Sequence, residues 1–278
     1  MLRKRLVTAL WGIPLLVVII WFGEPWFSIF VIIWGMLAVF EFYRLVKKPQ
    51  VSPLTYIGLA FTLLFILSRN PDLLSTLEKH FELNLLTPIL LTALVTLSLF
   101  RLLVLRQKEA AFAGWAWTIA GILYAGWLLG YLVSLRGLDD GRNWIFLALF
   151  TTFGSDTAAF FVGRAIGKHQ LAPQISPGKT REGAIGGIFG AILVSLFFLL
   201  PTPLSLSAYL NWGHAILLGI LVSVFGQLGD LVESLLKRNA GVKDSGGLIP
   251  GHGGVLDRMD SIVFAGIVVY YYVLWLIR

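Results

Sequence analysis

Long apolar runs, separated by short polar segments, recur along the whole chain. A run of about 17 to 25 apolar residues with few charges is long enough for a helix to cross the hydrocarbon core of a bilayer. The pattern predicts helices at residues 6–22, 26–42, 53–68, 87–104, 112–134, 144–163, 183–200, 212–232 and 260–277. We therefore expect an all-α, polytopic integral membrane protein with about nine transmembrane helices.

Composition supports this fold class. The chain is 57% hydrophobic and only 13% charged, which argues against a soluble domain, and no stretch is polar enough to form a separate one. Residues 1–278 are thus expected to form a single integral membrane domain, with N-terminal helices that carry no motif at 1–143 and a catalytic C-terminal half at 144–278. The absence of cysteine excludes a disulfide framework, a thiolate metal site and a cysteine nucleophile.

The distribution of basic residues predicts the orientation. With a cytoplasmic N-terminus, the segments on the cytoplasmic side hold all of the 22 basic residues except Arg69, Lys79, Arg136, Arg142 and Arg278. This asymmetry favours an N-terminus inside and a C-terminus outside. The net charge of +7 then reflects orientation and anionic lipid headgroups, so we expect membrane lipids and no nucleic acid as partners.

The stretch from Ser234 to Asp260 concentrates polar residues in the least apolar part of the chain. It holds four cations, three carboxylates, a histidine and several glycines, namely Lys237, Arg238, Lys243, Arg258, Asp244, Asp257, Asp260, His252, Gly253 and Gly254 among others. Glycines allow tight turns and the close approach of a ligand to the backbone. His252 has no second histidine at ligand spacing and is interpreted as a hydrogen-bonding loop residue.

Asp230 is expected near the end of the eighth span, where a carboxylate is costly unless it is paired or bound to a metal. On a helix it shares one polar face with Ser223, Gln227, Ser234 and Lys237. That face is either part of a functional site or a seam of hydrogen bonds between helices. The second interpretation suits the serines and Gln227 as well as the first, but suits Asp230 less.

Asp257 and Asp260 are expected to open the last span, three residues apart on one face. Each could simply favour a helix N-terminus. Together with Asp230 they form a set of hard oxygen ligands that suits Mg²⁺ holding substrate phosphates rather than zinc. Asp156, inside the sixth span, is a fourth candidate ligand or the partner of a basic residue on a neighbouring helix.

A second polar segment, from Ser176 to Gly183, contains Gly178-Lys179-Thr180. It is not a P-loop, because Pro173 stands where that motif needs glycine and no strand is expected before it. We expect a flexible cationic loop whose Lys179 and Arg181 neutralise phosphate charge. Alternatively, these cations only reflect the excess of positive charge on the inside.

The stretch from Ser234 to Asp260 resembles the signature of the phosphatidate cytidylyltransferases, also called CDP-diacylglycerol synthases. The likeness runs through Ser234, Lys237, Arg238, Lys243, Asp244, Pro250, His252, Gly253, Gly254, Asp257, Arg258 and Asp260. Ser155-Asp156 and the segment from Ser176 to Gly183 are also similar to this family, so the resemblance covers about the C-terminal half.

The resemblance implies the transfer of a cytidylyl group from CTP to phosphatidate, at the cytoplasmic face of a bacterial-type inner membrane. It implies catalysis by Asp230, Asp257, Asp260, Lys237 and Arg258, and substrate binding by Ser176, Lys179, Arg181, Arg238, Lys243, Asp244, His252, Gly253 and Gly254. The expected metal ligands are Asp230, Asp257, Asp260 and Asp156. The resemblance alone adds a monovalent cation such as K⁺ and a homodimer.

Two alternatives stay open. A CTP-dependent polyprenol kinase would use similar carboxylates and cations but should lack the full signature. An ion-coupled transporter could bind its ion at Asp156 and Asp230, but it would predict inverted repeats, whereas the polar residues within the predicted spans gather in the C-terminal half.

Overall fold

The computed structural model describes residues 2–46, 50–79, 82–104, 110–249, 251 and 253–277. The chain divides into two compact units, the first made of Met1–Gly137 and Asp244–Asp257 and the second of Leu138–Lys243 and Arg258–Arg278. The segment Asp244–Asp257, which we call the signature loop, thus belongs with the N-terminal helices. The expected single domain with a catalytic C-terminal half stays a prediction.

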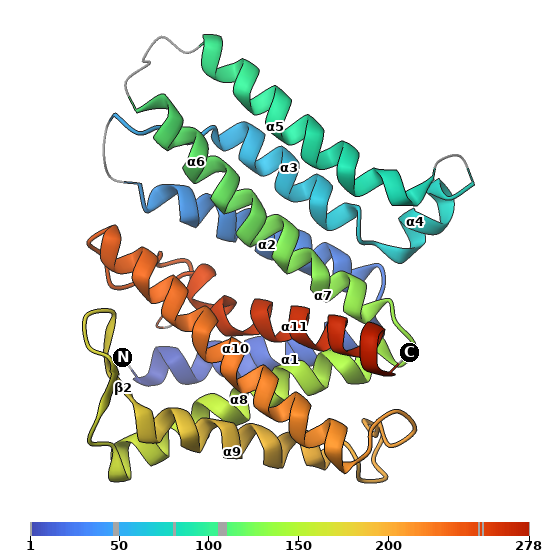
Figure 1. Cartoon of the computed structure of the whole chain (residues 1–278), viewed down its shortest axis with the longest axis vertical. Coiled ribbons are helices and arrows are strands. Elements are labelled where there is room, and N and C mark those ends of the chain that lie inside the picture. The colour runs from blue at the N-terminus through green and yellow to red at the C-terminus, as the bar shows by residue number, and fades with distance from the viewer. Residues whose placement is uncertain are drawn as a thin grey trace. The chain divides into compact units, whose positions relative to one another are not determined.

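The first unit is built from helices that follow one another along the chain (Figure 1). They are α1 (Leu2–Phe22), α2 (Trp26–Arg44), α3 (Thr55–Leu67), α4 (Pro71–Leu77), η1 (Leu83–Leu85), α5 (Leu86–Val104), α6 (Ala111–Ile122), η2 (Leu123–Leu128) and α7 (Leu129–Arg136). A buried cluster of Phe61, Phe65, Leu94 and Ile122 joins α3, α5 and α6. These helices therefore pack through apolar side chains.

Helix α4 lies in the region between residues 68 and 88 that the hydrophobic pattern leaves outside the membrane spans. Asn70 caps it, since its side-chain oxygen accepts a hydrogen bond from the Leu73 amide at 2.8 Å, and Pro71 occupies the first helical position. Both residue types favour the start of a helix. The sequence therefore carries a local helix signal here that the hydrophobic pattern does not.

The second unit contains helices α8 to α11 and a small β-hairpin, which Figure 1 colours from green to red. Its elements are α8 (Gly141–Ile166), β1 (Gln170–Ala172), β2 (Ser176–Thr180), α9 (Arg181–Phe197), α10 (Trp212–Asn239), α11 (Asp260–Tyr272) and η4 (Val273–Ile277). The short η3 (Leu256–Arg258) includes Leu256 and Asp257 of the first unit and Arg258 of the second. Helix α9 packs closely on α8, because a Cβ at Gly186 would overlap Val162 and one at Gly190 would overlap Ala158. Small residues allow such an approach within a membrane.

The predicted flexible loop at Ser176–Gly183 is instead largely a β-strand. Residues Ser176–Thr180 are strand β2, paired antiparallel with β1, with Gln170 opposite Thr180 and Ala172 opposite Ser176. The segment is therefore not a flexible loop. Strand β1 precedes it, although no strand was expected there. Backbone hydrogen bonds between two such short strands leave almost no periodic signal in the sequence.

The protein is an all-α polytopic membrane protein apart from this hairpin. Six described helices are long and apolar enough to span a bilayer, and a seventh span arises if α3 and α4, which meet at 82°, are counted together. Large apolar side chains such as Phe189 and Leu193 are exposed, as lipid-facing residues are. All nine predicted segments contain a helix, but α9 has only 17 residues and the apolar part of α1 is Leu10–Phe22, so nine spans stay a prediction.

Candidate active site

Helix α10 carries the polar stripe that its sequence spacing predicts. Near the middle of the helix, Ser223 Oγ lies 2.7 Å from Ser155 Oγ of α8, and Gln227 Nε2 donates to Ser223 Oγ at 2.9 Å and to the Ala184 carbonyl of α9 at 3.2 Å. Here the stripe is a seam of hydrogen bonds between helices. Asp230 and Lys237, further along, are engaged differently.

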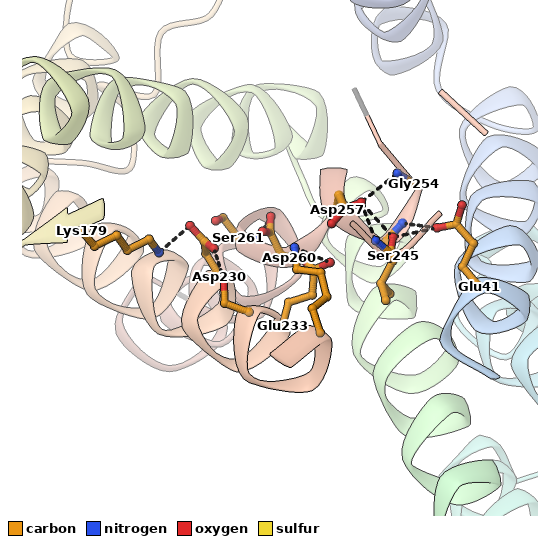
Figure 2. A network of polar contacts seen from close by, with 12 residues as sticks. Glu41, Lys179, Asp230, Glu233, Ser245, Gly254, Asp257, Asp260 and Ser261 are labelled. Atoms are coloured by element: carbon orange, nitrogen blue, oxygen red, sulfur yellow. Dashed lines mark hydrogen bonds and ion pairs between the residues drawn. The ribbon is translucent and has the colours of Figure 1, made fainter. Parts of the chain in front are cut away.

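Asp230 forms an ion pair with Lys179 of β2. Lys179 Nζ lies 2.5 Å from Asp230 Oδ2 (Figure 2). Ser234 Oγ donates to Asp230 Oδ1 at 3.2 Å. The two charged side chains are 26% and 31% exposed, so the pair is partly shielded from solvent. The hairpin thus brings together two candidate residues that lie 51 positions apart in the chain.

A cavity of about 470 Å³ lies beside this ion pair. Its polar lining comes from Asp156, Arg164, Lys179, Gln227 and Asp230, and its apolar lining includes Phe160 and Leu171. A concave site with a few convergent polar groups among apolar walls is typical of ligand binding. The structure therefore places Asp156, Lys179 and Asp230 in one hollow of the second unit.

The local order of the hairpin depends on Glu182, in the first turn of α9. Its Oε2 accepts hydrogen bonds from the amides of Lys168 at 3.1 Å and His169 at 3.2 Å, and its Oε1 lies 2.6 Å from His169 Nδ1. These hydrogen bonds, the one with the His169 side chain above all, lower the pKa of Glu182 to about 2. Thr180 caps the same helix by accepting from the Gly183 amide at 3.0 Å. Lys179 therefore lies in a strand whose end is fixed by these hydrogen bonds.

A second carboxylate cluster lies at the junction of α10 and α11. Glu233 is fully buried, and its Oε1 lies 3.3 Å from Lys237 Nζ one turn along α10. Asp260 opens α11, where its Oδ1 accepts a hydrogen bond from the Ser261 amide at 2.7 Å, and it interacts electrostatically with Asp230 and Lys237. Asp156 interacts in the same way with Asp230 and Asp260. Four carboxylates of the second unit thus form one electrostatic group with two lysines.

Asp257 lies in the other unit and has a different environment. Its Oδ2 accepts hydrogen bonds from the Ser245 amide at 3.0 Å, the Ser245 hydroxyl at 3.0 Å and the Gly254 amide at 2.8 Å. All three donors belong to the signature loop. The carboxylate of Asp257 therefore orders the loop that carries it.

The expectation that Asp257 and Asp260 open one helix is wrong. Helix α11 begins at Asp260, whereas Asp257 lies in the preceding η3 turn. Two residues three positions apart share a face only when both belong to the same helix. Here the loop hydrogen bonds hold Asp257 outside it.

The remaining candidates lie at several places. Arg238 Nε donates to the Ile175 carbonyl in the turn between β1 and β2 at 3.1 Å, and Arg181 opens α9, where its amide donates to the His169 carbonyl at 2.8 Å. Ser176 begins β2, whereas Lys243, Asp244 and Arg258 are exposed at the ends of the signature loop. Gly253 and Gly254 lie within that loop, and His252 falls outside the described residues.

The carboxylates of the second unit suit a magnesium ion by their chemistry. Asp156, Asp230 and Asp260 offer only oxygen ligands, and magnesium takes one or two carboxylates together with waters and substrate phosphates. A complete cage is not present, since no three His, Asp or Glu side chains in the described part of the chain are arranged to hold a metal by themselves. The donor set therefore fits a metal that shares its coordination with a substrate.

Two residues of this site were not predicted from the sequence. Arg164 is one of the basic residues that the orientation argument places on the cytoplasmic side, and it also lines the cavity. Glu233 was not considered, although its position three after Asp230 and four before Lys237 puts it next to both on α10. That helical spacing was a signal that could have identified Glu233.

Comparison with known proteins gives a consistent result. The family model described as "Cytidylyltransferase family" matches residues 3–276. A protein of Bacillus subtilis named phosphatidate cytidylyltransferase is 34% identical over 264 residues, which cover 95% of this chain and 94% of that protein. One with the same name from Staphylococcus haemolyticus is 32% identical over 266 residues, covering 95% of each chain. This protein is therefore a nucleotidyltransferase that belongs to the cytidylyltransferase family.

Proposed function

We propose that this protein transfers the cytidylyl group of CTP to phosphatidate, forming CDP-diacylglycerol and releasing pyrophosphate in phospholipid synthesis. The proposal extends to this chain the activity named in its relatives. The observation that carries it is the Lys179–Asp230 pair beside a cavity that Asp156 and Arg164 also line. Paired cations and carboxylates at a membrane surface suit a substrate with both phosphate groups and a lipid tail.

The reaction needs charge neutralisation more than proton transfer. A phosphatidate oxygen attacks the α-phosphorus of CTP, a new P–O bond forms, and the bond from the α-phosphorus to the bridging oxygen breaks. A phosphate monoester loses its second proton with a pKa of about 6, so the attacking oxygen needs no strong base at neutral pH. The cations of the second unit, Lys179, Lys237 and Arg258, then neutralise the phosphates and fix their positions.

Asp230 and Asp260, with Asp156, are the residues of the second unit proposed to hold Mg²⁺. A ligand role for Asp257, which belongs to the first unit, is proposed from the family resemblance alone. When bound, the metal supplies positive charge to phosphate oxygens and eases the departure of pyrophosphate. Binding of the metal by Asp230 would also free its present partner, Lys179. When Asp230 Oδ2 releases Lys179, the ammonium group of that lysine becomes available to a phosphate oxygen.

Location and assembly complete the proposal. The excess of basic residues in alternate loops supports an N-terminus in the cytoplasm and a C-terminus outside, with the site at the cytoplasmic face of a bacterial-type inner membrane. A homodimer and a monovalent cation such as K⁺ are proposed from the family resemblance alone. Chemical crosslinking in membranes and replacement of K⁺ by Na⁺ or choline test these two points.

The decisive experiment uses the full-length protein in detergent with CTP, phosphatidate and magnesium, and EDTA as control. CTP labelled at the α-phosphorus is expected to label the lipid while pyrophosphate is released. Transfer of label from the γ-phosphorus instead would indicate a lipid kinase, and no transfer from either position would reopen the transport alternative. Because each position of the label reports a different bond, the three functions are separated in one assay.

A further inference from the structure

Glu41 is an unexpected residue in helix α2 of the first unit. It lies in the apolar sequence MLAVFEFYR and is only 3% exposed. An apolar side chain would be easier to bury at such a position, because a buried carboxylate loses its hydration. The residue therefore needs an explanation beyond the packing of α2.

Its carboxylate contacts the signature loop. Glu41 Oε2 accepts a hydrogen bond from the Ser245 hydroxyl at 3.1 Å (Figure 2). It also accepts one from the Leu256 amide at 3.0 Å. The same Ser245 hydroxyl lies 3.0 Å from Asp257 Oδ2, so its single proton is shared between two carboxylates. Glu41 is thus connected to Asp257 through one serine.

The loop is shaped to admit this carboxylate. A Cβ atom at Gly246 would overlap Glu41 Oε1, and one at Gly254 would overlap both Glu41 Oε2 and the Ser245 hydroxyl. Two glycines of the loop therefore face a side chain that lies more than 200 residues earlier in the chain. Oε1 has no hydrogen-bond partner among the described residues, so the anchoring depends on Oε2.

We propose that Glu41 is a positioning residue for the cytidylyl transfer, which holds the signature loop so that Asp257 is presented in its working orientation. Glu41 acts through Ser245 and the Leu256 amide and does not touch the substrate. The anchoring of the loop stands on the contacts alone, whereas its role in turnover rests on the proposed function.

Three substitutions of Glu41 separate anchoring from charge. Glu41→Ala removes both hydrogen bonds. Glu41→Asp shortens the side chain by one carbon, roughly 1.5 Å, which takes the carboxylate out of hydrogen-bonding range. Glu41→Gln removes the charge but keeps an oxygen that can accept from both Ser245 and Leu256.

Ser28→Ala is the matched control. Ser28 lies on the same helix, is 4% exposed, and accepts a hydrogen bond from Asn70 at 2.9 Å. It precedes Glu41 by 13 positions, roughly 20 Å along α2. The control therefore removes a buried hydrogen bond of α2 without touching the signature loop.

The purified full-length variants are compared by hydrogen–deuterium exchange of peptides covering residues 244–257 and by steady-state kinetics with CTP and phosphatidate. Glu41→Ala and Glu41→Asp are expected to speed exchange of the Leu256 amide about tenfold or more, because the loss of its hydrogen bond to Glu41 has an effect of roughly that size. They are expected to lower kcat about 100-fold, because Asp257 would be displaced from its working position. The change in KM for CTP should be smaller. Glu41→Gln is expected to keep at least about a third of kcat, and Ser28→Ala to leave loop exchange unchanged.

Two results would overturn the proposal. One is loop exchange in Glu41→Ala that matches Ser28→Ala. The other is a kcat in Glu41→Gln as low as in Glu41→Ala, which would mean that the charge and not the hydrogen bonds matters. If the unmodified protein transfers no cytidylyl group, the proposed function fails, and the exchange data still decide whether Glu41 anchors the loop.

Discussion

The replacement of Asp230 by asparagine is the sharpest test of the site. Asp230→Asn leaves an oxygen that can accept the hydrogen bond from Ser234, but it removes the ion pair with Lys179. The change is nearly isosteric, so α10 should form as before. Any loss of activity then reports on the carboxylate charge.

The effects on stability and on turnover should differ in size. Exposed ion pairs contribute about 0–1 kcal/mol, and breaking a fully buried pair costs about 3–5 kcal/mol. With side chains 26% and 31% exposed, the Lys179–Asp230 pair lies between these limits, and we expect a stability loss of about 1–3 kcal/mol. Loss of a charged group that acts on the transition state costs about 100-fold to 1000-fold in kcat.

The assay measures cytidylyl transfer by the purified, monodisperse variant over a range of magnesium concentrations. Lys179→Met is the matched control because it breaks the same ion pair from the other side. Both variants should lose similar stability in thermal unfolding. Only Asp230→Asn should raise the half-saturating magnesium concentration at least tenfold, about 1.4 kcal/mol of binding free energy.

The reasoning fails if folded Asp230→Asn turns over at near the wild-type rate with an unchanged magnesium requirement. It also fails if Lys179→Met shifts the magnesium requirement as much as Asp230→Asn does. The first outcome would remove Asp230 from the site, and the second would make its carboxylate a structural partner of Lys179 only.

Three further predictions concern the loop, the hairpin and the packing of α8 on α9. Asp257→Asn should lower kcat at least about 100-fold while loop exchange stays near wild type, because asparagine keeps an acceptor oxygen; retained activity would contradict the role of the charge. Since the pKa of Glu182 is lowered to about 2 from an ordinary 4.5, its contribution to stability is complete above pH 4.5 and is lost as pH falls toward 2. His169→Ala should therefore make the β1–β2 amides exchange faster at pH 3 to 4 than in the wild type, and equal rates would refute this. Gly186→Leu should lower stability by about 1–3 kcal/mol or more through overpacking, whereas Gly178→Ala, where a Cβ has open space, should not, as thermal unfolding would reveal.

The sequence predicted the helices well because apolar length is the main physical requirement for crossing a bilayer. It also singled out Asp156 and Asp230, since a carboxylate in an apolar helix stands out, and the structure places both at one cavity. The β1–β2 hairpin was missed because its strands are three and five residues long. Such pairing depends on backbone hydrogen bonds between neighbours and not on a periodic pattern of side chains.

Glu41 shows why the rest of the site could not be predicted. Its carboxylate stands out in the apolar sequence of α2, but nothing nearby indicates what it contacts, because its partners Ser245 and Leu256 lie 204 and 215 positions away. The position of Asp257 was misjudged for a related reason, since hydrogen bonds from Ser245 and Gly254 place it outside α11. Long-range partners of this kind become visible only when the chain has folded.

The return of the signature loop to the first unit has a consequence for biogenesis. During synthesis α2 is made early, and about 200 further residues must be added before Ser245 is available to bind Glu41. Closing so long a loop costs conformational entropy before the contacts of Glu41 with Ser245 and Leu256 can offset that cost. The most recognisable segment of the chain should thus be among the last to reach its place, and a fragment that begins after α7 would carry the complete signature without the helix that anchors its loop.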